Sequence, residues 1–118
     1  MKTKMFVLWA VIIIISCSDN DDSVCGVINP TEDLSWLKNE IEDREATPSD
    51  FSKYFYIAQA TYKFQTVFVF EDCCPYCNTA IFVFDCKGNR IGQINNGIQR
   101  KDVKNTKVIY KPKDFKCE

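Results

Sequence analysis

Six cysteines follow the first twenty residues of this short chain, and they constrain its fold more than any other feature. They are Cys25, Cys73, Cys74, Cys77, Cys86 and Cys117. An even number of cysteines in a small exported domain indicates a disulfide framework. The 101 residues from Ser18 onward would bury only roughly 60–65% of the unfolded surface, so crosslinks would support a thin core. We therefore expect a fold held together by disulfide bonds.

The pairing of these six cysteines is open, because six allow 15 connectivities. Neighbouring side chains point in opposite directions along an extended chain, so a bond between Cys73 and Cys74 would be strained. Cys25 and Cys117 lie near the two ends of the domain. A bond between them could join the termini and would contribute roughly 4 kcal/mol in the chain-entropy description.

The N-terminus has the pattern of a secretory signal peptide. Lys2 and Lys4 precede an apolar run from Met5 to Ile15, and a basic start before a short apolar segment is typical of export signals. A membrane-spanning helix needs about 20 apolar residues, so this run is too short to be one.

The residues that close this run suggest lipid attachment. Ile14-Ile15-Ser16-Cys17 resembles the lipobox of bacterial lipoproteins. The resemblance implies that Cys17 carries a thioether-linked diacylglycerol, that the chain is cut before it, and that the new N-terminus is acylated. Several acyl chains anchor a protein stably in a bilayer. We expect residues 1–16 to be the signal peptide, 17–29 the lipidated cysteine and tether, and 30–118 one small domain.

An acidic run, Ser18–Asp22, follows Cys17. It could be a solvated tether, since so polar a segment cannot bury itself. It also resembles the acidic export signal of Bacteroidetes-type surface lipoproteins, which implies the outer face of the outer membrane; the periplasmic face or the inner membrane is the alternative. Asp22-Ser23-Val24 resembles the O-glycosylation motif of that group, which predicts a glycan on Ser23.

Composition narrows the chemistry. The chain contains no histidine, which excludes Ser-His-Asp, Cys-His and histidine–metal sites, and no cofactor is predicted. Without Lys2 and Lys4, the mature chain is acidic, with a net charge of about −3. The charge is uneven, because residues 18–50 are acidic and residues 99–118 basic. We favour two complementary faces of one fold over a basic binding patch, and expect no nucleic-acid partner.

The domain should begin with one amphipathic helix. Leu34, Leu37 and Ile41 lie on one stripe of a helix over Thr31–Asp43. Thr31 or Asp33 could cap it, and Thr47-Pro48 should end it, because the residue before a proline leaves the helical region.

The remaining residues predict strands separated by turns. The expected strands are Tyr54–Tyr62, Thr66–Glu71, Thr79–Asp85, Arg90–Ile94 and, as a short last one, Val108–Tyr110. We therefore expect an α+β fold, one N-terminal helix packed on a four- to five-stranded antiparallel meander. The central strands are apolar on both faces and need cover on both. The second cover could come from terminal segments or barrel-like closure; otherwise an aromatic face is left for a partner.

One cysteine motif suggests redox chemistry. Cys74-Pro75-Tyr76-Cys77 is identical to the active-site tetrapeptide of glutaredoxins, which implies Cys74 as attacking thiolate and Cys77 as resolving thiol. The chain departs from that family, because a strand-like segment follows the motif in place of a helix, and the family's Thr-Val-Pro segment is absent. We favour a structural disulfide. A four-thiolate metal site from Cys73, Cys74, Cys77 and Cys86 is a weaker alternative, because the second half of a zinc motif is missing.

Two stretches carry a broader resemblance. Residues 25–38, from Cys25-Gly26-Val27 to Trp36-Leu37-Lys38, and the later Asp85-Cys86-Lys87-Gly88-Asn89 resemble a family of small uncharacterised lipoproteins from Bacteroidetes-type bacteria. The resemblance implies a compact α+β domain without established activity. Our leading hypothesis is a non-enzymatic binding or structural module. A protein or glycan would contact the aromatic face or the loop Asp72–Asn78. The alternatives are a tethered thiol–disulfide oxidoreductase and a small hydrolase inhibitor presenting the Cys73–Cys77 loop.

Overall fold

The computed structural model of this chain describes residues 23–117. The predicted signal peptide, the predicted lipidation site Cys17 and the acidic run Ser18–Asp22 lie outside the described residues.

The helix forms where its apolar stripe predicts, but in two pieces. A short α1 (Pro30–Asp33) precedes α2 (Ser35–Ala46), and the extended backbone of Leu34 separates them. Leu37 and Ile41 are buried. The Asp33 carboxylate accepts a hydrogen bond from the Asn29 N–H at 3.1 Å. α2 ends at Ala46, before Thr47 and Pro48, as the sequence predicts.

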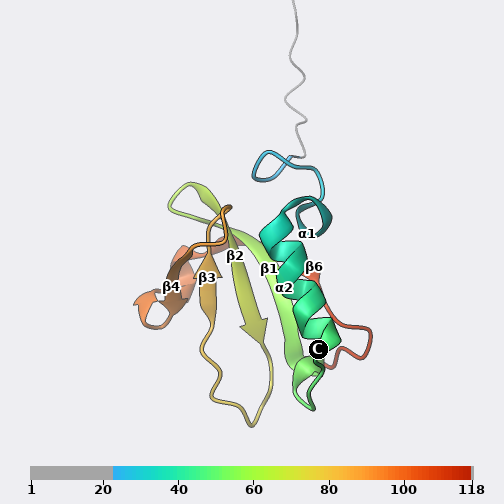
Figure 1. Cartoon of the computed structure of the whole chain (residues 1–118). Coiled ribbons are helices and arrows are strands. Elements are labelled where there is room, and N and C mark those ends of the chain that lie inside the picture. Colours follow the sequence, from blue (N-terminus) through green and yellow to red (C-terminus); the bar gives the residue numbers. More distant parts are fainter. Residues whose placement is uncertain (1–22, 118) are drawn as a thin grey trace, which may run out of the picture.

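The sheet has six strands and is mixed (Figure 1). The strands are β1 (Phe55–Tyr62), β2 (Gln65–Asp72), β3 (Phe82–Phe84), β4 (Arg90–Ile94), β5 (Gly97–Ile98) and β6 (Lys104–Tyr110), in the spatial order β5-β4-β3-β2-β1-β6. The first four form the expected antiparallel meander. Two short 3₁₀ helices, η1 (Ser52–Tyr54) and η2 (Arg100–Asp102), precede β1 and β6.

The predicted four- to five-stranded meander is therefore wrong in two details. β5 adds a two-residue strand that is parallel to β4. β6 is longer than expected and does not follow β4 in the sheet, but pairs with β1 at the opposite edge. The reason lies in the segment between Asn95 and Val103, which crosses the sheet to bury its second face.

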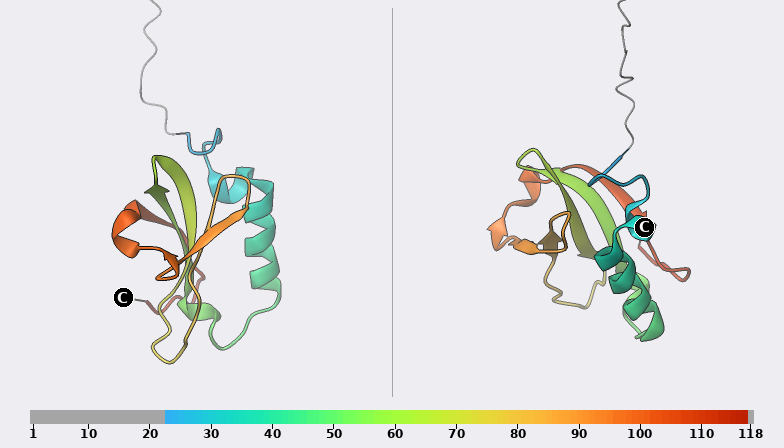
Figure 2. Two further views of the ribbon diagram at one scale, coloured as in Figure 1. Left: turned by 90° about the vertical axis from the view of Figure 1, so that its left-hand side faces the viewer. Right: turned by 45° about the horizontal axis from the view of Figure 1, so that its top comes forward.

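Chain segments pack on both faces of the sheet, as strands apolar on both sides require. α2 covers one face, where its Leu37 and Ile41 pack with Ile57, Phe68 and Phe70. The crossing segment covers the other, where its Ile98 and Val103 pack on side chains that include Val67, Val69 and Val83. Figure 2 (left) shows the helix and the crossing segment on opposite sides of the sheet. The second cover is thus the chain's own C-terminal third.

A buried carboxylate fastens the crossing segment. Glu71, on β2, is 7% exposed and accepts two hydrogen bonds from the Arg100 guanidinium, at 2.9 and 3.1 Å. The Tyr56 hydroxyl also donates to Glu71, at 3.2 Å. Burial and the neighbouring Glu71 carboxylate raise the pKa of Tyr56. A buried charge with a bidentate partner is structurally satisfied, so we assign Glu71 a structural role.

All six cysteines are paired. The bonds are Cys25–Cys86, Cys73–Cys117 and Cys74–Cys77. The expected Cys25–Cys117 staple is wrong, because β6 runs antiparallel to β1 and carries the C-terminus to the opposite end of the sheet from Cys25 (Figure 1). There Lys116 donates its N–H to the Lys53 carbonyl, and Cys117 bonds to Cys73.

The β1–β2 turn has an unusual sequence for its geometry. Lys63 and Phe64 both have positive φ, 47° and 64°. Two-residue hairpins of this kind prefer Asn-Gly, and a side chain with a Cβ at such φ costs roughly 1–2 kcal/mol. Phe64 is fully exposed, at 105%, so burial of its ring does not offset this backbone cost.

We expect the double change Lys63→Asn with Phe64→Gly to stabilise the fold by about 1 kcal/mol, because it relieves this backbone cost. Urea denaturation followed by circular dichroism measures it as a higher midpoint at unchanged slope. The matched change Lys87→Asn, at an exposed position with no positive φ, should leave the midpoint unchanged. A lower midpoint for the double variant would show that Phe64 contributes to the fold.

Candidate functional site

An aromatic groove runs beside α2 on the helix face of the sheet. The helix is too narrow to cover all of this face, and a cavity of about 420 Å³ remains next to it. Its walls are Trp36, Glu40, Arg44, Phe55, Phe70, Glu71, Asp72, Thr79, Ala80, Phe82, Phe84 and Gly88. The sequence analysis left an open aromatic face as the alternative to full cover, and a part of the helix face lined by aromatic side chains stays open.

Trp36 forms a rigid wall of the groove. Its indole N–H donates to the Cys86 carbonyl at 2.8 Å. Its ring lies edge-on to Phe68 at 5.7 Å between centroids and stacks towards Phe70 at 6.4 Å. Gly88 brings the backbone against the ring, since a Cβ there would lie 2.7 Å from Trp36 Cδ2. Trp36 therefore joins α2 to the β3–β4 turn.

That turn is itself well ordered by Asp85. The Asp85 Oδ1 atom accepts hydrogen bonds from the N–H groups of Lys87 and Asn89, both at 2.9 Å. Slight burial raises the pKa of Asp85, but the hydrogen bonds from Asn89 and Lys87 outweigh it and lower the pKa overall. The turn thus presents Gly88 to Trp36 in a fixed position.

Cations lie over two of the rings that line the groove. The Arg44 guanidinium carbon lies 3.9 Å from the centre of the Phe55 ring, and Arg44 Nε is 3.0 Å from Glu40 Oε1. The Arg90 guanidinium lies 4.4 Å from the Phe82 ring. Cation–π contacts of this kind hold guanidinium groups in place at partly exposed sites. The groove is therefore apolar along its floor and charged at its rim.

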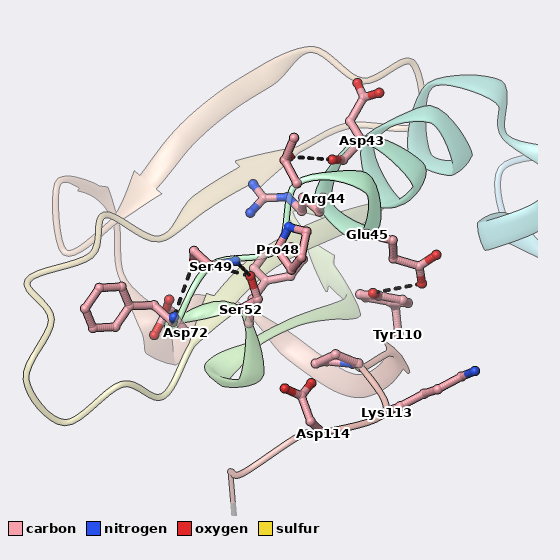
Figure 3. A pocket seen from close by; sticks show the side chains of 14 residues that line it. Asp43, Arg44, Glu45, Pro48, Ser49, Ser52, Asp72, Tyr110, Lys113 and Asp114 are labelled. Atoms are coloured by element: carbon pink, nitrogen blue, oxygen red, sulfur yellow. Dashed lines mark hydrogen bonds between the residues drawn. The ribbon is translucent and has the colours of Figure 1, made fainter.

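A second hollow, the C-terminal pocket, adjoins the groove (Figure 3). It has a volume of about 650 Å³ and lies between the end of α2, the loop to β1 and the segment after β6. Arg44, Phe55 and Asp72 line both hollows, so the two form one continuous surface. Ser49 and Ser52 hydrogen-bond to each other within the loop at 3.3 Å.

Tyr110 closes one side of this pocket. Its hydroxyl donates to Glu45 Oε1 at 3.1 Å, which ties β6 to the end of α2. Burial and the Glu45 carboxylate raise the pKa of Tyr110 to about 12. Sequence patterns did not identify Arg44 or Glu45, since single charged residues near a helix end carry no distinct signal. They predicted a strand at Tyr110 but not its contact with the end of α2.

We expect Tyr110 to titrate about two pH units above an exposed tyrosine. Its folded pKa is raised from 10.0 to about 12, so the fold favours the neutral phenol. The Glu45–Tyr110 contact should stabilise the fold fully below pH 10 and lose its effect as the pH rises towards 12. The tyrosinate absorbance of the wild type minus that of Tyr110→Phe isolates this residue. A difference titration centred at pH 10 would contradict the expectation.

The Cys74-Pro75-Tyr76-Cys77 motif forms a disulfide-closed turn after β2. Cys74 is buried, Cys77 is half-buried, and Tyr76 is 86% exposed. The Cys74 N–H donates to Asp72 Oδ1 at 2.8 Å. No helix begins within residues 73–81 of the described chain, so the helix N-terminus that activates a glutaredoxin thiolate is missing here.

The structure does not assemble the four-thiolate set considered from sequence. Cys73 is bonded to Cys117 and Cys86 to Cys25, so neither joins Cys74 and Cys77 as a free thiol. Asp72, Cys74 and Cys77 do bring their ligand atoms within 4.8 Å of one another, but the two sulfurs are bonded to each other.

Of the remaining predicted site residues, Ser23 lies at the start of the described chain. It is half-buried and lines a third hollow with Gln59, Lys107 and Val108. Cys17 lies outside the described residues. Between residues 23 and 117, every helix is too short or too polar to span a bilayer.

Comparisons of the whole chain with protein-family models, with curated proteins and with solved structures found no match.

Proposed function

We propose that this chain is a membrane-anchored bacterial lipoprotein of the Bacteroidetes type that acts as a non-enzymatic binding module on the outer face of the outer membrane. Cys17 would carry the lipid, and the aromatic groove would hold a protein or glycan partner. The lipobox-like sequence supports the anchor. The open aromatic groove is the observation that carries the binding function.

The groove has the features of a binding surface. Folding buries large aromatic side chains when it can, and it buries Phe70 here, but the opening leaves Phe82 and Phe84 half-exposed beside it. Apolar walls with a few fixed polar groups are typical of ligand sites. Arg44 is held over Phe55, and Trp36 is fixed by Cys86. Little ordering is therefore needed when a partner binds, which favours affinity.

Trp36 provides the test. It is the one tryptophan of the mature chain and lines the groove, so its emission should change when the groove is filled. We would titrate the mature protein with soluble bacterial and host polysaccharides and, separately, with exported proteins of the same organism. A saturable shift that Phe82→Ala weakens at least tenfold supports the proposal and names the partner class.

The control for this titration is Tyr76→Ser. Tyr76 is exposed on the disulfide turn and lies outside the groove. The Tyr76→Ser variant should bind the partner with unchanged affinity if the groove is the site. If Tyr76→Ser loses affinity and Phe82→Ala keeps it, the partner binds at the Cys74–Cys77 turn. The groove is then not the site.

A tethered thiol–disulfide oxidoreductase is the second candidate, because Cys74 and Cys77 are bonded to each other and Cys77 is half-exposed. In this form the disulfide would oxidise a substrate dithiol, which gives up two electrons and two protons as Cys74 and Cys77 become thiols. Incubation with a reduced model dithiol tests it. The double variant Cys74→Ser with Cys77→Ser should lose this oxidation, and Tyr76→Ser should keep it. That result would favour this candidate over the binding module.

A further inference from the structure

Phe64 occupies a position that the fold gives no reason to fill with an aromatic residue. It is 105% exposed at the tip of the β1–β2 hairpin, in the left-handed conformation, φ 64°. Glycine or asparagine would suit this backbone better. An exposed aromatic ring in an unfavourable conformation points to a contact outside the molecule.

The end of the molecule that carries Phe64 is also the end where the described chain begins. Ser23 lies with Gln59 and Lys107 around one hollow, and β1 reaches the hairpin three residues after Gln59. The Cys25–Cys86 bond holds the β3–β4 turn at the same end. Figure 1 shows both turns and the start of the described chain together, opposite the loop of residues 73–81. We call this surface the tether end.

Exposed lysines surround Phe64 at the tether end. Lys63 is its neighbour, Lys104 pairs with Thr61 at the start of β6, and Lys87 lies in the β3–β4 turn. Among the described acids at this end, Asp85 accepts the hydrogen bonds of its own turn and Asp33 accepts from Asn29. The tether itself carries Asp19, Asp21 and Asp22, which oppose contact with anionic lipid, so the lysines are the groups that would meet the phosphates. Ile28 adds a second apolar side chain, 80% exposed.

We propose that the tether end docks on the bilayer, with Phe64 inserted among the acyl chains and the lysines against anionic lipid phosphates. This inference rests on the lipid anchor at Cys17 proposed above. Five residues lie between Cys17 and Ser23, and the six steps from one Cα to the other span at most about 22 Å, so an anchored domain stays within reach of the surface. An aromatic ring beside basic side chains suits the boundary between acyl chains and headgroups. The groove then stays available for a partner.

Two tryptophan variants of the mature lipidated protein test the docking. Phe64→Trp places a reporter at the tether end, and Tyr76→Trp places one on the opposite loop, at a side chain 86% exposed. Both are reconstituted in equimolar phosphatidylglycerol and phosphatidylcholine vesicles whose acyl chains are brominated. After subtraction of the wild-type Trp36 signal, we expect Trp emission at position 64 to be quenched at least threefold more than at position 76. In vesicles of brominated phosphatidylcholine alone, the difference in quenching between positions 64 and 76 should be smaller.

The remaining outcomes separate the two proposals. Protein that floats with the vesicles while both reporters are quenched equally overturns the docking and leaves the anchor intact. Protein that stays in solution overturns the anchor and the docking with it. A blue-shifted reporter at position 64 without vesicles, together with a doubled molecular mass, overturns the docking by showing that a second copy covers Phe64. Quenching unchanged in phosphatidylcholine alone overturns the role of anionic phosphate.

Discussion

Replacing both Cys25 and Cys86 by serine is expected to lower the free energy of unfolding by about 4 kcal/mol. Their bond joins residues 61 apart in sequence, and a closed loop of that length restricts the unfolded chain strongly. A domain of this size has a total stability of roughly 5–15 kcal/mol. The variant should therefore be close to unfolding at physiological temperature.

Urea denaturation of the double variant measures this loss, and the third disulfide supplies a matched control. Cys74 and Cys77 lie three residues apart, so the same relation gives them under about 2 kcal/mol. Serine at both positions should cost less than half as much as serine at Cys25 and Cys86. Equal losses for the two pairs would show that native contacts of the sulfurs, and not loop closure, decide their contributions.

Gly88→Ala is expected to destabilise the fold by about 3 kcal/mol, through two effects at one position. The backbone has φ +83°, which disfavours any residue with a Cβ, and the new Cβ would lie 2.7 Å from Trp36 Cδ2. The indole cannot move away freely, because its N–H is bonded to the Cys86 carbonyl. The variant should also red-shift Trp36 emission, since the ring is displaced towards solvent.

Gly26→Ala separates the two effects. Gly26 has nearly the same φ, +78°, but a Cβ there meets nothing within 4 Å. It should cost only the backbone contribution, about 1 kcal/mol, and leave Trp36 emission unchanged. If both alanine variants lose the same stability, contact with Trp36 does not matter, and the rigid wall assigned to the groove would be incorrect.

The positions of Gly88 and Trp36 also explain the motifs that stood out in the sequence. The Trp36-Leu37-Lys38 segment and the turn Asp85–Asn89 are about 50 residues apart. In the structure they meet through the Trp36–Cys86 hydrogen bond, beside the Cys25–Cys86 bond. Trp36, Cys86 and Gly88 all take part in this contact, which the sequence could not display because nothing local links the two segments.

Local patterns were sufficient for the helix and for the four strands that form the meander. The stripe of Leu34, Leu37 and Ile41 predicted α2, because helix periodicity is visible within a few turns. The β6 strand was mostly missed, since Lys104–Lys107 are exposed edge residues with no apolar alternation. β6 forms because its backbone pairs with the open edge of β1, which depends on the rest of the sheet.

The sequence by itself determined that a small, disulfide-bonded α+β domain follows an apolar N-terminal segment. Composition, periodicity and cysteine number can all be read without knowing which distant segments meet. Only the tertiary structure decided which cysteines pair, which face the C-terminal third covers, and where the groove stays open. The cysteine pairing depends on β6 returning to β1 and carrying Cys117 away from Cys25. Contacts between distant segments decide such features, and residue spacing does not encode them.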